Sequence, residues 1–167
     1  MSDYYLIKLS TTLYFRRPRV TGGGARGIHG TTASHATPPR ADSDLYYASG
    51  AGGLEEMKRL LTTPGVNINN RGRGSSTPVM EAAVRGHRDV VELLVSEGAD
   101  VSLDDLEGNN IHHHACWGGD LETVKFVLSL NVVDIDAKNN DGETAADLAR
   151  DWGHQPGVEL LVSRGAQ

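Results

Sequence analysis

The sequence predicts an all-α solenoid in which short helix-turn-helix units stack on one another. First, a pattern recurs every 33 or 34 residues: Ala82 and Ala115 occupy matching positions, and so do Gly86 and Gly119. A period of this length is typical of repeat architectures. Second, hydrophobic residues make up 38% of the chain and aromatic residues 5%, while 20 of the 167 residues are glycine. This composition favours many short helices over one large core, which would have to be built from Leu, Val and Ala.

The second copy of the pattern indicates two helices. Thr77 is a typical N-cap residue, and Pro78 fits the first helical position, where its missing N–H costs nothing. Gly86 is placed to end this helix. Valine and leucine recur at helical spacing within residues 89–95 and form one apolar stripe, after which Gly98 is placed to end the second helix. Because helices this short are marginal alone, each unit must be stabilised by its neighbours.

Four copies account for about three quarters of the chain. The first and third copies lack the Thr-Pro opening of the second. Divergence is expected in the copies at the ends of a stack, because they face solvent on one side. It is not expected in the third copy, so the middle of the stack is the predicted weak point. The approximate bounds of the copies are residues 43–74, 75–108, 109–142 and 143–167.

The second copy resembles the ankyrin-repeat family. Residues 77–82 read Thr-Pro-Val-Met-Glu-Ala, close to the family's T-P-L-H-x-A opening. Residues 86–94 match its G-H-x-x-V-V-x-L-L core, and residues 98–101 read Gly-Ala-Asp-Val, as its repeats end. The resemblance implies an ankyrin-repeat solenoid with short β-turn or hairpin loops between units. It also implies a non-catalytic module that binds another protein through a concave surface.

Two kinds of position form that surface in the family. One is the pair of variable residues before the Gly-His step, and the other is the turn before the next Thr-Pro. Carried onto this chain, the resemblance implies these partner-binding residues: Val84, Arg85, Leu106, Glu107, Trp117, Gly118, Asn140, Asp141, Asp151 and Trp152.

Both tryptophans of the chain belong to this set. Trp and Arg are the residue types that most often dominate binding energy at interfaces. Arg85, Trp117 and Trp152 are therefore candidates for one anchor patch. The alternative is that the indoles fill gaps between stacked units.

A histidine cluster at residues 112–114, followed by Cys116, suggests a metal site, because imidazole and thiolate suit zinc and residues 112 and 116 are one helical turn apart. However, consecutive helical residues point about 100° apart, so three adjacent histidines cannot share one ion without further ligands. By the resemblance, His113 occupies the position of a structural histidine. We therefore expect no metal or cofactor, with a metal-binding site as the less favoured alternative.

Nothing in the sequence indicates an enzyme. No nucleophile and base stand in a recognisable arrangement, and the glycine-rich residues 22–27 lack the lysine and hydroxyl residue of a phosphate-binding loop. A single cysteine excludes an internal disulfide and fits a reducing compartment.

Charge divides the chain into two parts. Residues 1–42 hold six Lys or Arg against two Asp, a net charge of +4, and residues 43–167 hold 10 against 20 acidic residues, a net charge of −10. The first part is also rich in Ser, Thr and Gly and cannot bury enough apolar surface to offset ordering entropy, so it is predicted to be a disordered basic tail. The alternative is a targeting peptide for organelle import, since the segment is basic, rich in hydroxyl residues and poor in acid.

The net negative charge of the repeat domain indicates the kind of partner that it binds. It favours a protein with a basic surface and disfavours nucleic acid, whose phosphates it would repel. No run of apolar residues is long enough to cross a membrane. We expect a monomeric adaptor or scaffold in the cytoplasm or nucleus, unless the tail directs import. The alternatives are a regulatory subunit or inhibitor of an enzyme, and a basic tail that masks the acidic domain.

Overall fold

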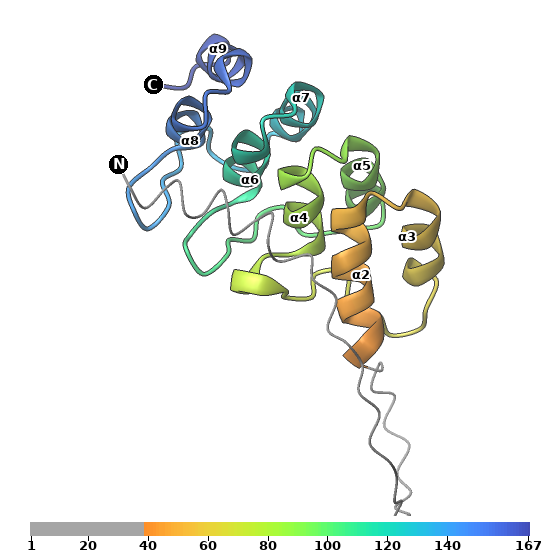
Figure 1. Ribbon diagram of the computed structural model, residues 1–167. Coiled ribbons are helices and arrows are strands. Elements are labelled where there is room, and N and C mark those ends of the chain that lie inside the picture. The colour runs from red at the N-terminus through yellow and green to blue at the C-terminus, as the bar shows by residue number, and fades with distance from the viewer. Residues whose placement is uncertain (1–38) are drawn as a thin grey trace, which may run out of the picture. The chain divides into compact units, whose positions relative to one another are not determined.

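The computed structural model describes residues 39–167, which fold into pairs of short antiparallel helices (Figure 1). A single 3-10 turn, η1 (Arg73–Ser75), precedes the second pair. The all-helical solenoid predicted from the repeat is thereby confirmed. The helix pairs are α2 (Pro39–Ala51) with α3 (Leu54–Leu61), α4 (Pro78–Val84) with α5 (Arg88–Ser96), α6 (Ile111–Gly118) with α7 (Leu121–Ser129), and α8 (Ala145–Asp151) with α9 (Gln155–Ser163).

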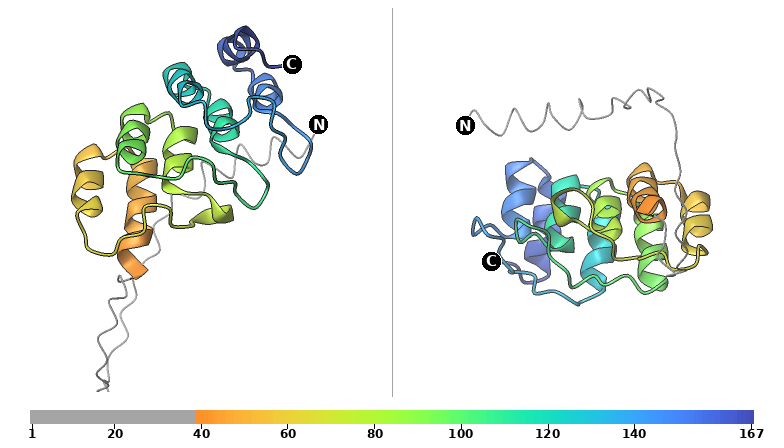
Figure 2. Two further views of the ribbon diagram at one scale, coloured as in Figure 1. Left: turned by 180° about the vertical axis from the view of Figure 1, so that it is seen from behind. Right: turned by 90° about the horizontal axis from the view of Figure 1, so that it is seen from below.

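The helices lie in two rows. Helices α2, α4, α6 and α8 pack against one another in sequence and form the inner row, and α3, α5, α7 and α9 form the outer row (Figures 1 and 2). Each helix contacts its own pair partner and the matching helix of the next pair. Long loops lead from each outer helix to the next inner helix, and one of them is closed by an antiparallel bridge between Lys138 and Thr144.

Small and branched apolar residues fill the space between the rows, as the composition predicted. Leu45, Leu94 and Leu161 are fully buried, and alanines take the tight positions of the inner row. Burying such a leucine contributes about 1.5–3 kcal/mol. Because the core runs along the stack, each pair depends on its neighbours for burial.

The third pair replaces the missing Thr-Pro opening with another cap. The side chain of Asn110 accepts hydrogen bonds from the backbone N–H groups of His112 and His113 at the start of α6. Thr144 caps α8 in the same way through the N–H of Asp147. Asn is as good an N-cap as Thr, so the loss of the Thr-Pro opening does not leave α6 uncapped.

Histidines in the short turns tie neighbouring pairs together. The Nε2 atom of His87 lies 3.1 Å from the carbonyl oxygen of Gly50, and that of His154 lies 3.1 Å from the carbonyl oxygen of Trp117. At the matching position in the third pair stands Asp120, whose carboxylate caps α7 through the N–H and hydroxyl of Thr123. The third pair, where the stack is predicted to be weakest, therefore has a helix cap at the position where the second and fourth pairs have a histidine bonded to the preceding pair.

The first inner helix begins before the predicted domain boundary. Helix α2 starts at Pro39, so residues 39–42 belong to its first turn and not to a disordered tail that runs to residue 42. The Asp42 carboxylate accepts a hydrogen bond from the N–H of Asn67 at 2.9 Å, which joins this turn to the following loop. The remaining predictions for the tail, disorder, import and masking, concern residues 1–38 and lie outside the described residues. Of the helices within 39–167, none is both long and apolar enough to span a bilayer.

Candidate functional site

The predicted partner-binding residues fall at two places in the fold. One group lies at the C-terminal ends of the inner helices, and the other lies in the loops that lead into the next inner helix. The helix ends carry Val84, Arg85, Trp117, Gly118, Asp151 and Trp152, and the loops carry Leu106, Glu107, Asn140 and Asp141.

The two tryptophans contact each other across the junction of α6 and α8. Their ring centroids lie 5.8 Å apart, with the ring planes inclined at 43°. Both residues are half-buried, and the ring of His114 lies 6.3 Å from that of Trp117. The pair thus fills space between two units and also leaves aromatic surface open to solvent, so it has features of both alternatives that the sequence raised.

Arg85 belongs to a hydrogen-bonded network that joins α2 to α4. Its Nε atom donates to Glu81 Oε1 at 3.2 Å, and the hydroxyl of Tyr46 donates to Glu81 Oε2 at 3.0 Å. The Tyr46 hydroxyl also lies 2.9 Å from Ser76 Oγ. Burial, together with the Glu81 carboxylate, raises the pKa of Tyr46 to about 12. Arg85 is therefore oriented by contacts within the domain.

Tyr46, Glu81 and Ser76 were not among the predicted site residues. The four-residue spacing of Glu81 and Arg85 on one helix was a usable signal for their ion pair. The bond from Tyr46 joins residues 35 positions apart, and no local pattern indicates it.

The helix-end residues Val84 and Gly118 lie against each other. A Cβ atom added to Gly118 would overlap the carbonyl oxygen of Val84. Gly118 therefore allows α6 to approach the end of α4 and can offer only backbone to a partner. Its place among the binding residues remains a prediction, but packing alone already explains why glycine occurs here.

The loop residues are tied to the loops on either side. The N–H of Leu106 donates to the carbonyl oxygen of Gly74 at 2.9 Å. The N–H of Asn140 donates to the carbonyl oxygen of Glu107 at 2.9 Å, and its side-chain amide donates to that of Leu106 at 3.1 Å. The side chain of Leu106 is nevertheless 71% exposed, and Glu107 and Asp141 are exposed as well. The loops therefore present side chains from a hydrogen-bonded backbone.

The histidine cluster is directed to different partners. Nδ1 of His113 accepts from the N–H of Asn110, which leaves Nε2 to donate to the carbonyl oxygen of Glu143 at 3.1 Å. Nε2 of His114 lies 2.9 Å from Asp105 Oδ2. Burial lowers the pKa of His113 and raises that of the Cys116 thiol to about 12, so Cys116 is a poor metal ligand. Among residues 39–167, no three His, Cys, Asp or Glu side chains are grouped to hold a metal ion.

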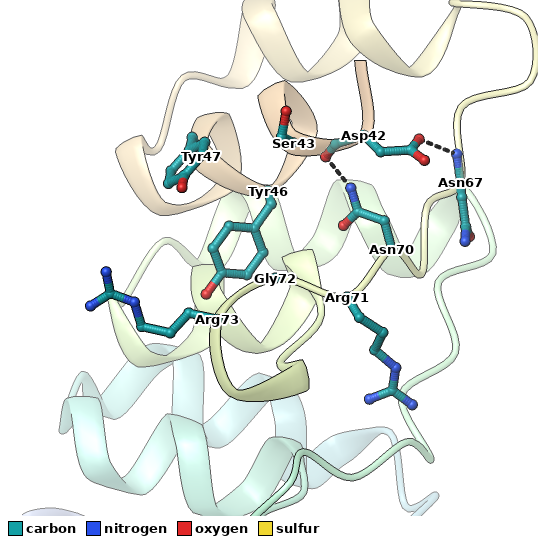
Figure 3. A pocket seen from close by; sticks show the side chains of 9 residues that line it. All are labelled: Asp42, Ser43, Tyr46, Tyr47, Asn67, Asn70, Arg71, Gly72 and Arg73. Carbon is teal, nitrogen blue, oxygen red and sulfur yellow. Dashed lines mark hydrogen bonds between the residues drawn. The ribbon is translucent and has the colours of Figure 1, made fainter. Parts of the chain in front are cut away.

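A groove that sequence analysis did not predict lies beside the first inner helix (Figure 3). It has a volume of about 570 Å³ and lies between α2 and the loop that connects α3 to η1. The signal available in the sequence was weak, because the first copy matches the repeat poorly and the two walls are far apart in the chain. The residues that line the groove are Asp42, Ser43, Tyr46, Tyr47, Asn67, Asn70, Arg71, Gly72 and Arg73.

Known proteins resemble the chain along most of the helical region. A family model for ankyrin repeats in three copies matches residues 35–105, and a model for ankyrin repeats in many copies matches residues 94–149. The E3 ubiquitin-protein ligase KEG of Arabidopsis thaliana is 30% identical over 119 residues, which are 66% of this chain and 7% of the ligase. Ankyrin repeat and SAM domain-containing protein 6 of Mus musculus is 32% identical over 106 residues, 63% of this chain and 12% of that protein.

A shorter relative is covered more fully. Protein phosphatase 1 regulatory subunit 27 of Homo sapiens is 33% identical over 97 residues, which are 58% of this chain and 62% of that subunit. The chain thus spans less than two thirds of each of these relatives. The ankyrin repeat is a fold that mediates protein–protein interaction and is not itself catalytic. With its helix pairs, its repeat motifs and both family models in agreement, the chain belongs to the ankyrin-repeat family.

Proposed function

We propose that this protein is a non-catalytic adaptor or scaffold that binds a protein partner through the concave surface formed by its inner helices and the loops beside them. The contact between Trp117 and Trp152 carries the proposal. Two half-exposed indoles side by side offer a partner a broad apolar surface that needs little ordering on binding. Arg85, whose guanidinium is ion-paired with Glu81, lies on the same row of helices.

The loops support this proposal because their backbone is ordered by hydrogen bonds. Bonds through the backbone and the Asn140 amide join Leu106, Glu107 and Asn140, so the loop backbone that carries these side chains has little freedom to lose. Binding to a preordered surface avoids part of the entropy cost of association. The exposed Leu106 would then make an apolar contact beside the acidic Glu107.

Charge supports a partner with a basic surface. Residues 43–167 carry a net charge of −10, and Glu107, Asp141 and Asp151 are exposed on the predicted surface. Opposite charge on the partner would speed association and make it sensitive to salt. For the same reason we do not propose a nucleic acid as the partner.

The test compares the proteins captured by the full chain and by two variants. Trp117→Ala with Trp152→Ala removes the aromatic pair, and Phe126→Ala removes a half-buried aromatic side chain from the outer helix α7 as a matched control. We expect a defined set of partners to be lost from the double variant and retained by the control, with both variants folded by circular dichroism. Equal capture by all three proteins would contradict the proposal.

A second candidate is a regulatory subunit or inhibitor of an enzyme. It is favoured by the similarity to protein phosphatase 1 regulatory subunit 27, 62% of which this chain covers. The direct test is to measure binding of the purified chain to the catalytic subunit of protein phosphatase 1 and the effect on its activity. Binding without any change in activity would favour a scaffold, and the absence of binding would remove this enzyme from consideration.

We propose that the protein acts in the cytoplasm or nucleus. We also propose that it is a monomer. The lone, buried Cys116 is compatible with a reducing compartment. Import into an organelle through the basic N-terminal segment is the alternative, and imaging a C-terminally tagged protein together with sequencing of its mature N-terminus distinguishes the two. The molar mass of the purified chain in solution, measured by light scattering, tests whether it is a monomer.

A further inference from the structure

Three aromatic rings lie side by side across the junction of α6 and α8. The ring centroid of Trp117 lies 6.3 Å from that of His114 and 5.8 Å from that of Trp152. Neighbouring rings are inclined at 36° and 43°, so they are neither stacked flat nor perpendicular. We call these three residues the aromatic cluster. Because α6 and α8 are neighbours in the inner row (Figures 1 and 2), the cluster belongs to the surface that we propose for the partner.

One end of the aromatic cluster is held by a buried carboxylate. Nε2 of His114 lies 2.9 Å from Asp105 Oδ2, and each of these two side chains is only 7% exposed. Burial opposes the charge of Asp105, but hydrogen bonds from His114 and Asn109 outweigh it and lower the pKa of this carboxyl below its ordinary value. Asp105 therefore stays ionised at neutral pH, and it orients the ring beside Trp117.

A second acid lies at the other end of the cluster. Asp151 directly precedes Trp152 and is exposed. It occupies in α8 the position that Trp117 has in α6, so it follows Trp117 along the inner row of helices. The cations at the ends of α4 and α8, Arg85 and Arg150, are each paired with an acid of their own helix. The surroundings of the cluster therefore favour a cation from outside the domain.

A planar cation suits the exposed parts of these rings. Both indoles are half-buried and keep part of their surface open to solvent. The face of an aromatic ring attracts cations, and tryptophan does so most strongly. A guanidinium is flat, is less strongly hydrated than an ammonium, and stacks on aromatic faces. The chain contains such a contact on its outer helices, where Cζ of Arg88 lies 5.9 Å from the ring centroid of Phe126.

We propose that the aromatic cluster binds an arginine side chain of the partner, whose guanidinium stacks on the indoles while the carboxylates at the two ends favour its charge. The inference rests on the proposed function and deepens it, because it names the residue of the basic partner that meets Trp117 and Trp152. An apolar side chain of the partner is the competing ligand. The arginines within residues 1–38 of this chain are the competing source of a guanidinium.

The experiment uses the full ¹⁵N-labelled chain and four capped pentapeptides of sequence Gly-Ser-X-Ser-Gly, in which X is arginine, lysine, citrulline or leucine. Citrulline has the shape of arginine without its charge. Because Trp117 and Trp152 are the two tryptophans of the whole chain, their indole N–H resonances report on this site alone. We expect the arginine peptide to shift both resonances.

The order of the four affinities decides between the ligands. The citrulline and leucine peptides should bind at least about fivefold more weakly than the arginine peptide, because the attraction of a cation to the rings is lost. The lysine peptide should bind at least about twofold more weakly, because a hydrated ammonium does not stack. Equal binding of the arginine and leucine peptides would overturn the inference in favour of an apolar site. Equal binding of the arginine and lysine peptides would overturn it in favour of unspecific attraction by charge.

Matched variants test the residues of the cluster without removing its packing. Trp117→Phe with Trp152→Phe keeps two rings but weakens their attraction for a cation, so the preference for arginine over leucine should fall at least about twofold, as read from backbone resonances. Asp151→Asn should also weaken the arginine peptide. Glu97→Gln, which removes an exposed acid from the end of the outer helix α5, should leave its affinity unchanged. An arginine preference that survives in the double phenylalanine variant would contradict the inference.

Two further comparisons identify the source of the arginine and separate the inference from the proposed function. A full-length variant without the N-terminal arginines should bind the arginine peptide as the unaltered chain does. A gain of about fivefold or more would show that the chain's own segment occupies the cluster and would overturn its assignment to a partner. If no peptide preference is found while the double alanine variant at positions 117 and 152 still loses partners, the inference falls and the proposed function stands. The replacements in the N-terminal variant are Arg16→Gln, Arg17→Gln, Arg19→Gln and Arg26→Gln.

Discussion

The indoles of Trp117 and Trp152, 35 positions apart in the chain, lie 5.8 Å from each other where α6 ends beside the end of α8. Trp117 lies in the last turn of α6, and Trp152 is the C-cap of α8. Their contact joins the third and fourth units. It also leaves part of the junction with the fourth unit, which ends the described stack, accessible to solvent.

Trp152→Ala is expected to weaken both folding and partner binding. The variant loses the ring contact and part of the buried aromatic area, which we expect to lower the free energy of unfolding by about 1–2 kcal/mol. Trp152→Phe keeps an aromatic ring at the same place and should recover most of the stability. Urea unfolding monitored by circular dichroism measures both variants. A Trp152→Ala chain as stable as the unaltered protein would mean that the contact contributes nothing to packing.

His154→Ala is expected to loosen the junction between the third and fourth units. The imidazole bonds to the carbonyl oxygen of Trp117 and packs on Gly119, where a side chain would overlap it. Loss of the bond and of this contact should lower the free energy of unfolding by about 1–2 kcal/mol. Hydrogen exchange then should accelerate in α8 and α9 more than in α2 and α3. Uniform acceleration along the stack would argue against a local role.

The stability of the folded chain is expected to fall as the pH is lowered through the range of histidine titration. Burial holds the pKa of His113 below its ordinary value of 6.5, and the same cause lowers the pKa of His112. Below pH 6.5 the unfolded chain therefore binds more protons than the folded chain, and stability decreases with falling pH. The stabilisation is complete above 6.5 and is lost as the pH falls toward the lowered folded values.

Two measurements check this pH dependence. The free energy of unfolding, measured from pH 8 to pH 5, should fall less steeply in His113→Gln than in the unaltered chain. Each histidine can contribute a slope of at most about 1.4 kcal/mol per pH unit. If the variant does not fold, NMR titration of the His113 ring protons in the unaltered chain gives the pKa directly. A midpoint at or above 6.5 would contradict the prediction.

Repeat spacing was enough to predict the helices, because glycine and proline punctuate each unit and the apolar stripes have the helical period. It placed Trp117 and Trp152 at helix ends but could not indicate that the rings touch, since that distance depends on how one unit is rotated against the next.

The groove beside α2 was missed for a related reason: its two walls come together only after the loop that follows α3 folds back onto α2. Composition grouped Pro39 and Asp42 with the basic tail, whereas α2 begins at Pro39. Both residues suit the first turn of a helix, proline through its fixed φ and aspartate through the helix dipole.

Gly118→Ala is expected to destabilise the chain, although alanine is normally the better helix former by about 1 kcal/mol. The reason is that the added methyl group would overlap the carbonyl oxygen of Val84, a backbone atom that cannot rotate away. Relief requires α6 to shift against α4, and overpacking of this kind costs about 1–3 kcal/mol. Gly157→Ala is the matched control, because Gly157 also lies within a helix, α9, and the nearest atom to a Cβ there is 3.9 Å away. Thermal and urea unfolding should show a clear loss for Gly118→Ala and no loss for Gly157→Ala. If Gly118→Ala instead kept full stability and lost only partner capture, the residue would belong to the binding surface and not to the packing between α4 and α6.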